Sequence, residues 1–363
     1  MEREQSRIKG VMNENRCRRF GLLGTESCQK FFEYRRHRGV IACDMMPRRL
    51  ENIKKKFPTI ETTSSFDGLL RRDDVAGIAI ATPVSTHYLL GMKVLEAGKH
   101  LLLEKPMAAK TSEAEELLDV AYSKMLTLMV DHTFVYTSAV QKMKELITKG
   151  EIGDILYFDS VRVNLGLFQH DTNVIWDLAP HDISIMDYLL DDKPIAVSCV
   201  GVNHFSEYED VAYVTVHFAE KLMAQFHVNW LSPVKMRKIL VGGTKLMVVY
   251  DDMEASEKIK VYDRGVDVKE EDAVYKKLVQ YRTGNMYSPN IDPGEALARM
   301  TAEFVDCINT GKPSISDGQA GVNVVKVLEA ANISIKAGGR RVDISSLSKS
   351  DNRTLISLPT YSN

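Results

Sequence analysis

The sequence predicts an α/β protein with two domains, an N-terminal doubly wound parallel sheet and a C-terminal α+β domain with a large, mostly antiparallel, open-faced sheet. Short apolar runs alternate with amphipathic stretches from residue 39 to about residue 131, which is the pattern of βαβ units. Further along, segments of period-two character follow one another with short turns, as antiparallel strands do. A chain of 363 residues, 44% of them hydrophobic, can bury two separate cores. We therefore expect domains at 1–132 and 133–345 and a tail at 346–363.

The N-terminal elements follow from the apolar runs and the residues that interrupt them. The predicted strands are RFGLL (19–23), GVIACD (39–44), GIAIAT (77–82), HLLLE (100–104) and LTLMVDH (126–132). Helices are predicted at 47–58, which two prolines delimit, at 86–98, and from about residue 111. RIKGVM (7–12) is an alternative first strand, and it would place NENRCR in the following loop.

The second half begins with a predicted helix at about 138–149 and continues mainly as strands. The predicted strands are 155–165, 194–205, 211–219, 222–230, 236–243, 246–252 and 258–263. A helix at about 176–190 interrupts them, and two more helices are predicted near 294–310 and 319–337. This order of elements is typical of an α+β domain.

Composition and motifs exclude several classes of function. The formal net charge of −2 gives no overall attraction to nucleic acid or to an anionic membrane, so we expect small-molecule ligands. The five cysteines form no C-x-x-C pair, and neither H-E-x-x-H nor a phosphate-binding P-loop is present, so we expect no metal. No run of 18 apolar residues and no signal-peptide pattern is found, so we expect a cytoplasmic protein without a membrane segment.

Asp44 is the clearest cofactor signal of the N-terminal half, because it ends the predicted second strand. In a dinucleotide-binding fold, an acid at that place accepts hydrogen bonds from the adenosine ribose and repels a 2′-phosphate, which favours NAD. Arg48 and Arg49 follow closely and would instead hold a 2′-phosphate, so NADP is the alternative. Asp44 also fits an ordinary turn acid before Pro47.

Two motifs, ATPVSTH (81–87) and LLLEKP (101–106), lie at the carboxyl ends of predicted parallel strands. Open α/β sheets bind ligands at that edge. An apolar strand would deliver the Lys105 ammonium there, where it can orient a hydroxyl or polarise a carbonyl. A solvated lysine in a turn is the alternative interpretation. Pro106 admits a cis bond that would aim the preceding side chain.

The segment WDLAPHDI (176–183) opens the predicted helix of the second half. Asp177 and His181 are four residues apart, so they share a helix face and can act as an orienting carboxylate and a general base. Two structural alternatives stay open: Asp177 as the N-cap with Pro180 in the first turn, and His181 as a buried histidine of the core.

Taken in order, these motifs resemble the glucose-fructose oxidoreductase and inositol dehydrogenase family, often written Gfo/Idh/MocA. The matching pieces are ACDMMPRRL (42–50), AIATPVSTHYLLGMKVLEAGKHLLLEKPMA (79–108), WDLAPHDIS (176–184) and DGQAGVNVVKVLEAA (317–331), so the resemblance spans about residues 39–345. It implies a Rossmann-type N-terminal domain. The E-K-P at a strand end, with a preceding A-T-P and a following D-x-x-x-H, is more specific than any one of these motifs.

The resemblance assigns a cofactor role to five positions. Asp44 would hold the adenosine ribose, and Glu104 would contact the nicotinamide ribose. Thr82, Pro83 and His87 would line the path of the cofactor.

The resemblance also assigns the chemistry. Lys105 would stand beside the nicotinamide and the reacting hydroxyl, while Asp177 and His181 would lie across the cleft. The implied reaction is reversible hydride transfer between the nicotinamide and a secondary alcohol of a sugar, nucleotide sugar or cyclitol. His181 would accept the proton and Lys105 would stabilise the developing oxyanion.

The substrate residues are expected on strands that face the cleft. The candidates are Arg162 and Asn164, then Phe168, Gln169 and His170, and the basic residues Lys235 and Arg237 of a later strand. The segment from Arg162 through WDLAPHD is most similar to relatives that act on the 3-position of nucleotide-linked amino sugars. Relatives associate through the open face of the second sheet, so we expect a homo-oligomer, a dimer or tetramer.

The segment FGLLGTESCQ departs from the family pattern. Aligned on RFGLL, the expected G-x-G-x-x-G becomes Gly24-Thr25-Glu26-Ser27-Cys28-Gln29, so two glycines are lost. Glu26 adds a side chain and a negative charge where pyrophosphate approaches the backbone, and Gln29 separates helix from strand. Gly24, Thr25 and Glu26 would still offer backbone N–H groups at a helix N-terminus. Three interpretations stay open: a distorted loop that binds dinucleotide, a catalytically inactive ligand-binding or scaffold protein, and an altered N-terminal sequence.

Overall fold

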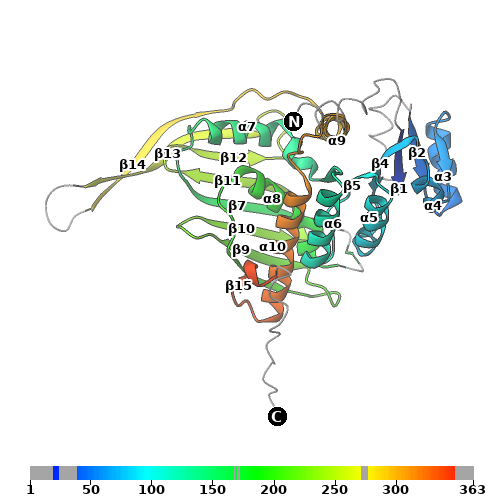
Figure 1. Cartoon of the computed structure of the whole chain (residues 1–363). Coiled ribbons are helices and arrows are strands. Elements are labelled where there is room, and N and C mark those ends of the chain that lie inside the picture. Colours follow the sequence, from blue (N-terminus) through cyan, green and yellow to red (C-terminus); the bar gives the residue numbers. More distant parts are fainter. Residues whose placement is uncertain (1–18, 24–38, 167, 170–171, 271–276, 348–363) are drawn as a thin grey trace, which may run out of the picture.

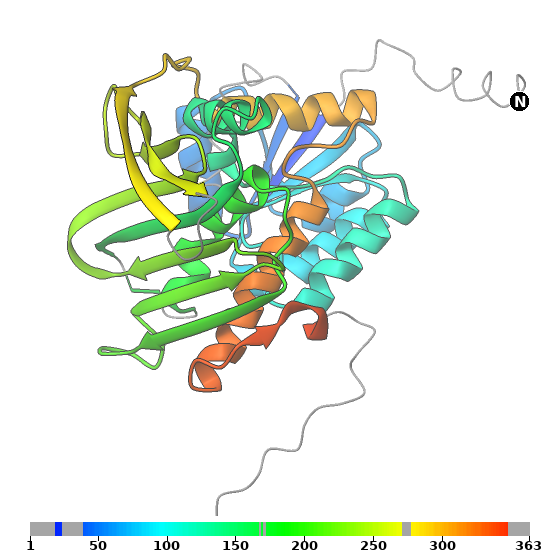
Figure 2. The ribbon, with the colours of Figure 1, turned by 90° about the vertical axis from the view of Figure 1, so that its left-hand side faces the viewer.

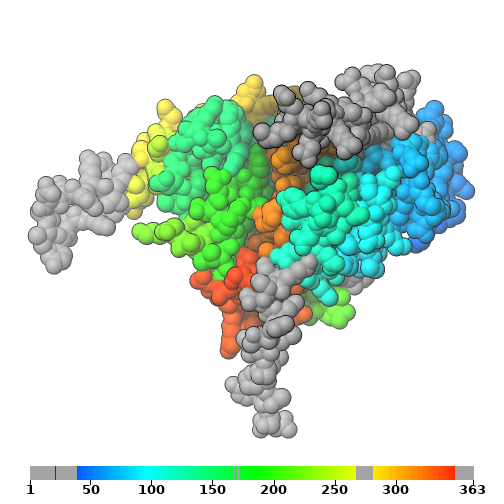
Figure 3. Space-filling model, in the orientation of Figure 1, coloured from blue at the N-terminus to red at the C-terminus, as the bar shows by residue number. Residues whose placement is uncertain are grey.

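Two sheets lie side by side in the molecule (Figure 1). The computed structural model describes residues 19–23, 39–166, 168–169, 172–270 and 277–347. One sheet is parallel and the other is mostly antiparallel, so the fold class expected from the sequence is confirmed. The surface of residues 318–336, orange in Figure 3, lies between the cyan N-terminal half and the green second half.

The N-terminal sheet has six parallel strands in the order β3-β2-β1-β4-β5-β6. They are β1 (Arg19–Leu23), β2 (Val40–Cys43), β3 (Glu61–Thr63), β4 (Val75–Ile80), β5 (His100–Leu103) and β6 (Leu128–Val130). Gly21 pairs with Ile41 of β2 and Ile78 of β4, which confirms RFGLL as a strand of this sheet. The alternative strand RIKGVM and the loop from Gly24 lie outside the described residues. The strand order is that of a dinucleotide-binding fold, and it reverses between β1 and β4.

Helices from both ends of the chain cover this parallel sheet. Between its strands lie α3 (Pro47–Lys56), α4 (Phe66–Leu70), the 3₁₀ turn η1 (Val84–Thr86), α5 (His87–Glu96) and α6 (Thr111–Ser123), and after β6 comes η2 (Thr133–Tyr136). Leu101 and Leu103 of β5 pack in one apolar cluster with residues of α5 and α6. Leu102 packs in a second cluster with Met300 and Phe304 of α9 (Ala296–Thr310). One face of the N-terminal sheet is therefore covered by a helix that comes late in the sequence, and the division at 132 stays a prediction.

The second sheet has nine strands in the order β14-β13-β12-β11-β7-β10-β9-β8-β15. They are β7 (Ile155–Leu165), β8 (Ala196–Val202), β9 (Val211–His217), β10 (Met223–Asn229), β11 (Leu231–Gly243), β12 (Met247–Asp251), β13 (Ile259–Glu270), β14 (Lys277–Tyr287) and β15 (Val342–Asp343). β7 and β10 run parallel, and the other neighbours are antiparallel. Strand β14 was not expected from the sequence.

Helices lie on only one side of the second sheet in the described part of the chain (Figure 2). They are α7 (Ser138–Thr148), α8 (Val174–Leu189) and α10 (Gly318–Lys336), and η3 (Ile344–Leu347) follows β15. Alternate residues of β9 and β10 are buried toward the helices, while Tyr213 and Met223 are exposed on the other face. Val200 and Val202 of β8 are also more than half exposed, at 56% and 52%. The open face expected from the sequence is thus apolar in part.

Candidate functional site

The carboxyl ends of β2, β4, β5 and β6 meet along one edge of the parallel sheet. Asp44, Thr82, Glu104 and Asp131 follow these four strands. The backbone N–H of Glu104 donates to the carbonyl of Ile80 at 2.9 Å, and the N–H of Asp131 donates to Leu103 at 2.7 Å. These bonds continue the ladder one step beyond the strands, so the polar side chains are held side by side.

A cavity of about 880 Å³ opens at the β2 and β4 ends of this edge. Asp44, Arg49, Thr82 and Pro83 are in its wall. Asp44 is 5% exposed, its Oδ1 accepts the N–H of Met46 at 2.8 Å, and its Oδ2 lies 3.6 Å from Nη1 of Arg49. A buried acid after β2 thus lies in the wall of a cavity large enough for a small-molecule ligand, and its contact with the adenosine ribose stays a prediction. The predicted cofactor residues Gly24, Thr25 and Glu26 lie outside the described residues.

His87 ties two loops of this edge together rather than presenting its ring to a ligand. Its side chain is buried, with Nδ1 2.8 Å from the carbonyl oxygen of Pro106 and Nε2 2.7 Å from that of Thr82. Burial lowers its pKa, while the two backbone contacts oppose that shift. The ring thereby connects the A-T-P loop to the E-K-P loop, and its place along the cofactor path stays a prediction.

Lys105 joins the two halves of the molecule. Its Nζ donates to the backbone carbonyl of Asp177 at 2.9 Å and lies 3.9 Å from Oδ1 of the same residue. The peptide bond that follows Lys105 is cis, as the sequence had admitted. Oδ2 of Asp177 accepts a hydrogen bond from Nε1 of Trp230 at 3.0 Å. Asp177 is not the N-cap of α8, because that helix begins at Val174.

His181 stands one turn beyond Asp177 on α8. Its ring meets Phe134 edge to face, with 5.0 Å between centroids, and its Nδ1 is buried without a hydrogen-bond partner. Desolvation lowers the pKa of His181 well below its ordinary value, and the charges of Lys105 and Arg162 lower it further. The imidazole is therefore neutral at pH 7 and able to accept a proton. The carboxylate of Asp177 contacts Lys105 and Trp230, so its orienting role toward His181 stays a prediction.

Two further residues of this edge escaped the sequence analysis. Asp131 is half-buried next to Glu104, and its Oδ1 accepts the backbone N–H and the hydroxyl of Thr133. Burial and the neighbouring charge of Glu104 raise the pKa of Asp131 to about 7. His132 is 1% exposed with neither ring nitrogen hydrogen-bonded, and its burial lowers its pKa to about 3. Both residues stand at the end of LTLMVDH, where the apolar pattern predicts a strand and carries no signal for a site.

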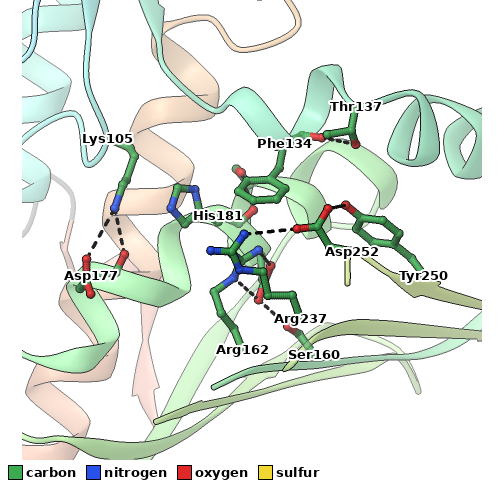
Figure 4. A network of polar contacts seen from close by, with 12 residues as sticks. Lys105, Phe134, Thr137, Ser160, Arg162, Asp177, His181, Arg237, Tyr250 and Asp252 are labelled. Atoms are coloured by element: carbon green, nitrogen blue, oxygen red, sulfur yellow. Dashed lines mark hydrogen bonds and ion pairs between the residues drawn. The ribbon is translucent and has the colours of Figure 1, made fainter. Parts of the chain in front are cut away.

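Arg162 forms a buried ion pair behind His181 (Figure 4). Its Nε and Nη2 donate to the two oxygens of Asp182 at 3.0 and 2.6 Å, and Ser160 donates to the same carboxylate at 2.6 Å. The guanidinium also lies over the ring of Phe134, 4.5 Å from its centroid. Asp182 was missed, because a carboxylate five residues after Asp177 gave no signal by itself. The substrate role of Arg162 stays a prediction.

Arg237 continues the network on the neighbouring strand. It pairs in register with Arg162, and its Nη1 donates to Asp252 at 3.3 Å. Tyr250 donates its hydroxyl to the other oxygen of Asp252 at 3.1 Å. In Figure 4 the side chains of His181, Phe134, Arg237, Asp252 and Tyr250 lie near one another, and Lys105 with Asp177 stands on the other side of His181. Each of the two facing guanidinium groups is thus balanced by its own carboxylate.

The other predicted substrate residues lie on or near β7 and β11. Asn164 is partly buried on β7, on the same side of the strand as Ser160 and Arg162. Lys235 is exposed, in the irregular part of β11. Phe168 packs edge to face on Trp230 at 5.6 Å between centroids, and His170 lies outside the described residues.

Two features are absent from the described residues. No group of three or more His, Cys, Asp or Glu side chains in this part of the chain is arranged to hold a metal ion. None of the described helices combines the length and the apolar character that crossing a bilayer requires.

Comparison with protein families matches both halves of the chain. Residues 20–132 match the model of an oxidoreductase family with an NAD-binding Rossmann fold, GFO_IDH_MocA. Residues 140–249 match the model of the C-terminal domain of the same family. The chain belongs to the Gfo/Idh/MocA family. The resemblance stated from the sequence motifs is therefore confirmed.

Individual Gfo/Idh/MocA relatives are distant. The scyllo-inositol 2-dehydrogenase (NADP(+)) IolW of Bacillus subtilis is 24% identical over 314 residues, 80% of this chain and 86% of IolW. The UDP-N-acetylglucosamine 3-dehydrogenase of Acidithiobacillus ferrooxidans is 25% identical over 282 residues, 75% of this chain and 82% of that enzyme. A structure of levoglucosan dehydrogenase with NADH and levoglucosan superposes with a TM-score of 0.75 at 19% identity, over 90% of this chain and 99% of that one. This last likeness concerns the fold alone.

Proposed function

We propose that this protein is an NAD(P)-dependent dehydrogenase that acts on a secondary alcohol of a sugar, nucleotide sugar or cyclitol. The observation that carries the proposal is the meeting of Lys105, from the parallel sheet, with Asp177 of α8 through a 2.9 Å hydrogen bond. His181 lies on the same helix with a neutral, partly unpartnered imidazole. A cation and a neutral base at the ligand-binding edge of a dinucleotide fold suit proton removal from an alcohol.

The cofactor would lie along the carboxyl edge, with Asp44 at the adenosine ribose, Thr82 and Pro83 beside it, and Glu104 at the nicotinamide ribose. When bound, the nicotinamide supplies the hydride acceptor. Asp44 favours NAD by repelling a 2′-phosphate, whereas Arg49, which shares the cavity wall, would compensate a 2′-phosphate. We propose NAD as the cofactor, with NADP as the alternative.

The side chains divide the proton chemistry between them. His181 is the proposed proton acceptor, since its ring is neutral and its buried Nδ1 has no hydrogen-bond partner. The Lys105 ammonium, held by the carbonyl of Asp177, stabilises negative charge on the substrate oxygen. Removing such a group from a reaction centre typically lowers the rate by a factor of about 10² to 10⁴.

For the substrate we favour a UDP-linked amino sugar oxidised at its 3-position. Support comes from the sequence between Arg162 and His181 and from the UDP-N-acetylglucosamine 3-dehydrogenase relative, which aligns over 75% of this chain. Exposed Lys235 on β11 adds positive charge that suits a phosphate, Arg237 is a further proposed contact although Asp252 balances its charge, and Asn164 and His170 are the other proposed contacts. The partly apolar open face of the second sheet supports a homo-oligomer.

Two experiments test these proposals. Purified protein is titrated with NADH and NADPH by nicotinamide fluorescence, and NAD reduction is then assayed with UDP-sugars, free hexoses and inositols. We expect saturable micromolar binding and turnover in the UDP-sugar group. Absence of binding of both nucleotides would favour the alternative of a catalytically inactive ligand-binding protein, and turnover of inositols or hexoses alone would refute the UDP-sugar assignment.

Paired variants check the role of Lys105. Lys105→Met should lower kcat about 10² to 10⁴-fold while NADH binding persists. Lys124→Met is the matched control, because Lys124 also donates its Nζ to a backbone carbonyl, that of Glu96, at an exposed place. Normal turnover by Lys105→Met would contradict the mechanism. Association is tested separately, by measuring the molar mass of the wild type and of Tyr213→Glu, a variant of the open face, by light scattering. A monomeric wild type would exclude the homo-oligomer.

A further inference from the structure

Asp131 and Glu104 form a half-buried pair of carboxyl groups, each directly after one of two adjacent strands. β5 and β6 pair Leu103 with Val130, so the next residues, Glu104 and Asp131, project from the same edge. The register places the two carboxyl groups beside each other, and the neighbouring charge of Glu104, together with desolvation, raises the pKa of Asp131 to about 7, so that below this pH the pair shares one proton. The pair is therefore an acid beside a carboxylate, with a single negative charge.

The remaining contacts of the pair fix its orientation. Thr133 donates its backbone N–H to Oδ1 of Asp131 at 3.2 Å, and its hydroxyl donates to the same oxygen. The backbone N–H of Lys105 donates to Oε2 of Glu104 at 3.1 Å. Asp131 is thus anchored by the turn after β6, and Glu104 is held from both sides. Neither the sequence motifs nor the reaction proposed above uses Asp131.

We infer that Asp131 is a positioning residue for the nicotinamide half of the site: as a carboxylic acid it donates to Glu104 and sets the direction in which Glu104 meets the ribose of the cofactor. This inference rests on the proposed function, which places the nicotinamide ribose at Glu104. Loss of the shared proton leaves two adjacent carboxylates, whose repulsion turns Glu104 away. NADH therefore binds more weakly once the pair has ionised.

Other charged groups near the pair do not substitute for Asp131. Lys105 follows Glu104 on the β5 side, His132 is the neighbour on the β6 side, and Asp177 and His181 face the edge from α8. The two imidazoles have lowered pKa values, so they stay neutral above pH 6. A change in affinity between pH 6 and 8.5 that depends on residue 131 then reports the pair.

The test compares NADH with ADP, which lacks the nicotinamide riboside, in the wild type and in Asp131→Asn. Asparagine accepts from Thr133 and donates to Glu104 but does not titrate. With the proton lost near pH 7, wild-type NADH affinity should fall roughly tenfold between pH 6 and 8.5, and that of Asp131→Asn should stay constant. The dissociation constant for ADP in Asp131→Asn, divided by that in the wild type, should stay near one from pH 6 to 8.5. Asp131→Ala, which lacks the donor, should bind NADH weakly at every pH.

Three results separate failure of this inference from failure of the proposed function. A flat wild-type NADH profile, or the same pH profile in Asp131→Asn, overturns the role of Asp131 and leaves the cofactor assignment standing. An equal effect of Asp131→Asn on ADP and NADH overturns it as well, because the adenosine half would then be affected. If the wild type binds neither NADH nor NADPH at any pH, the proposed function fails and the inference fails with it. Asp44→Ala should weaken both NADH and ADP and serves as the control for the other half.

Discussion

The ion pair between Arg162 and Asp182 offers a direct measurement of how the site is supported. Both side chains are almost fully buried, at 4% and 3% exposure, and the carboxylate accepts two hydrogen bonds from Arg162 and one from Ser160. Arg162→Met removes two charge-assisted bonds and leaves a buried carboxylate with the Ser160 hydroxyl alone. Breaking a buried pair from one side costs about 3 to 5 kcal/mol. For a domain of this size each kcal/mol lowers Tm by about 2 to 4 °C, so a loss of roughly 6 to 20 °C is expected.

The double variant Arg162→Met/Asp182→Leu decides whether the pair itself is responsible. Replacing both partners by apolar side chains removes the unpaired charge, so the double variant should recover most of the loss of either single one. Urea and thermal unfolding of the wild type, the two single variants and the double variant give the coupling free energy, expected at about 3 kcal/mol or more. A single-variant loss below about 1 kcal/mol, or a double variant as unstable as the sum of the singles, would refute this reasoning. If the double variant folds, its KM then tests the proposed contact of Arg162 with substrate.

Three other predictions concern the parallel sheet. Gly21→Ala places a Cβ 2.5 Å from Cδ2 of buried Leu69, so it should lower the free energy of unfolding by about 1 to 3 kcal/mol in urea, and an unchanged midpoint would contradict this packing. His87→Phe removes the ring that bridges two loop carbonyls, so it should lower the free energy of unfolding by about 1 to 3 kcal/mol and weaken NADH binding. A wild-type affinity for NADH in this variant would show that the bridge does not shape the cofactor path. Asp131 has its folded pKa raised from 3.8 to about 7, so the native state binds the extra proton, and stability falls by up to about 1.4 kcal/mol per pH unit as pH rises from 4 to 7. Asp131→Asn should remove that slope in unfolding curves at pH 5 and 8, and a persistent slope would assign it to other groups.

Residues whose role depends on their own strand or helix were predictable from the sequence. Asp44 and Lys105 come shortly after strands that the apolar pattern predicts, so their place at the carboxyl edge of the sheet follows from that pattern alone. RFGLL was likewise placed correctly as a strand, although the loop after it lies outside the described residues.

Roles that depend on a distant partner were not predictable. His87 has the spacing of a cofactor residue, but its two carbonyl partners are fixed only when the two loops meet. Asp182 acquires meaning from Arg162, 20 residues earlier on a strand. Asp131 is an ordinary strand-end acid until the pairing of β5 with β6 brings Glu104 beside it. In each case the information lies in tertiary contacts and desolvation, which periodicity does not contain.

The late arrival of α9 has a consequence for how the protein is made. Met300 and Phe304 of that helix complete an apolar layer with Leu102 and Met129 of the parallel sheet. Once about 150 residues have left the ribosome, every described strand of the parallel sheet has been made. One face of that sheet still lacks α9, which is completed only after about 150 more residues. During that interval the nascent sheet offers an apolar surface to chaperones and to other nascent chains. Premature stop codons before residue 296 should therefore yield aggregates rather than an independent nucleotide-binding module.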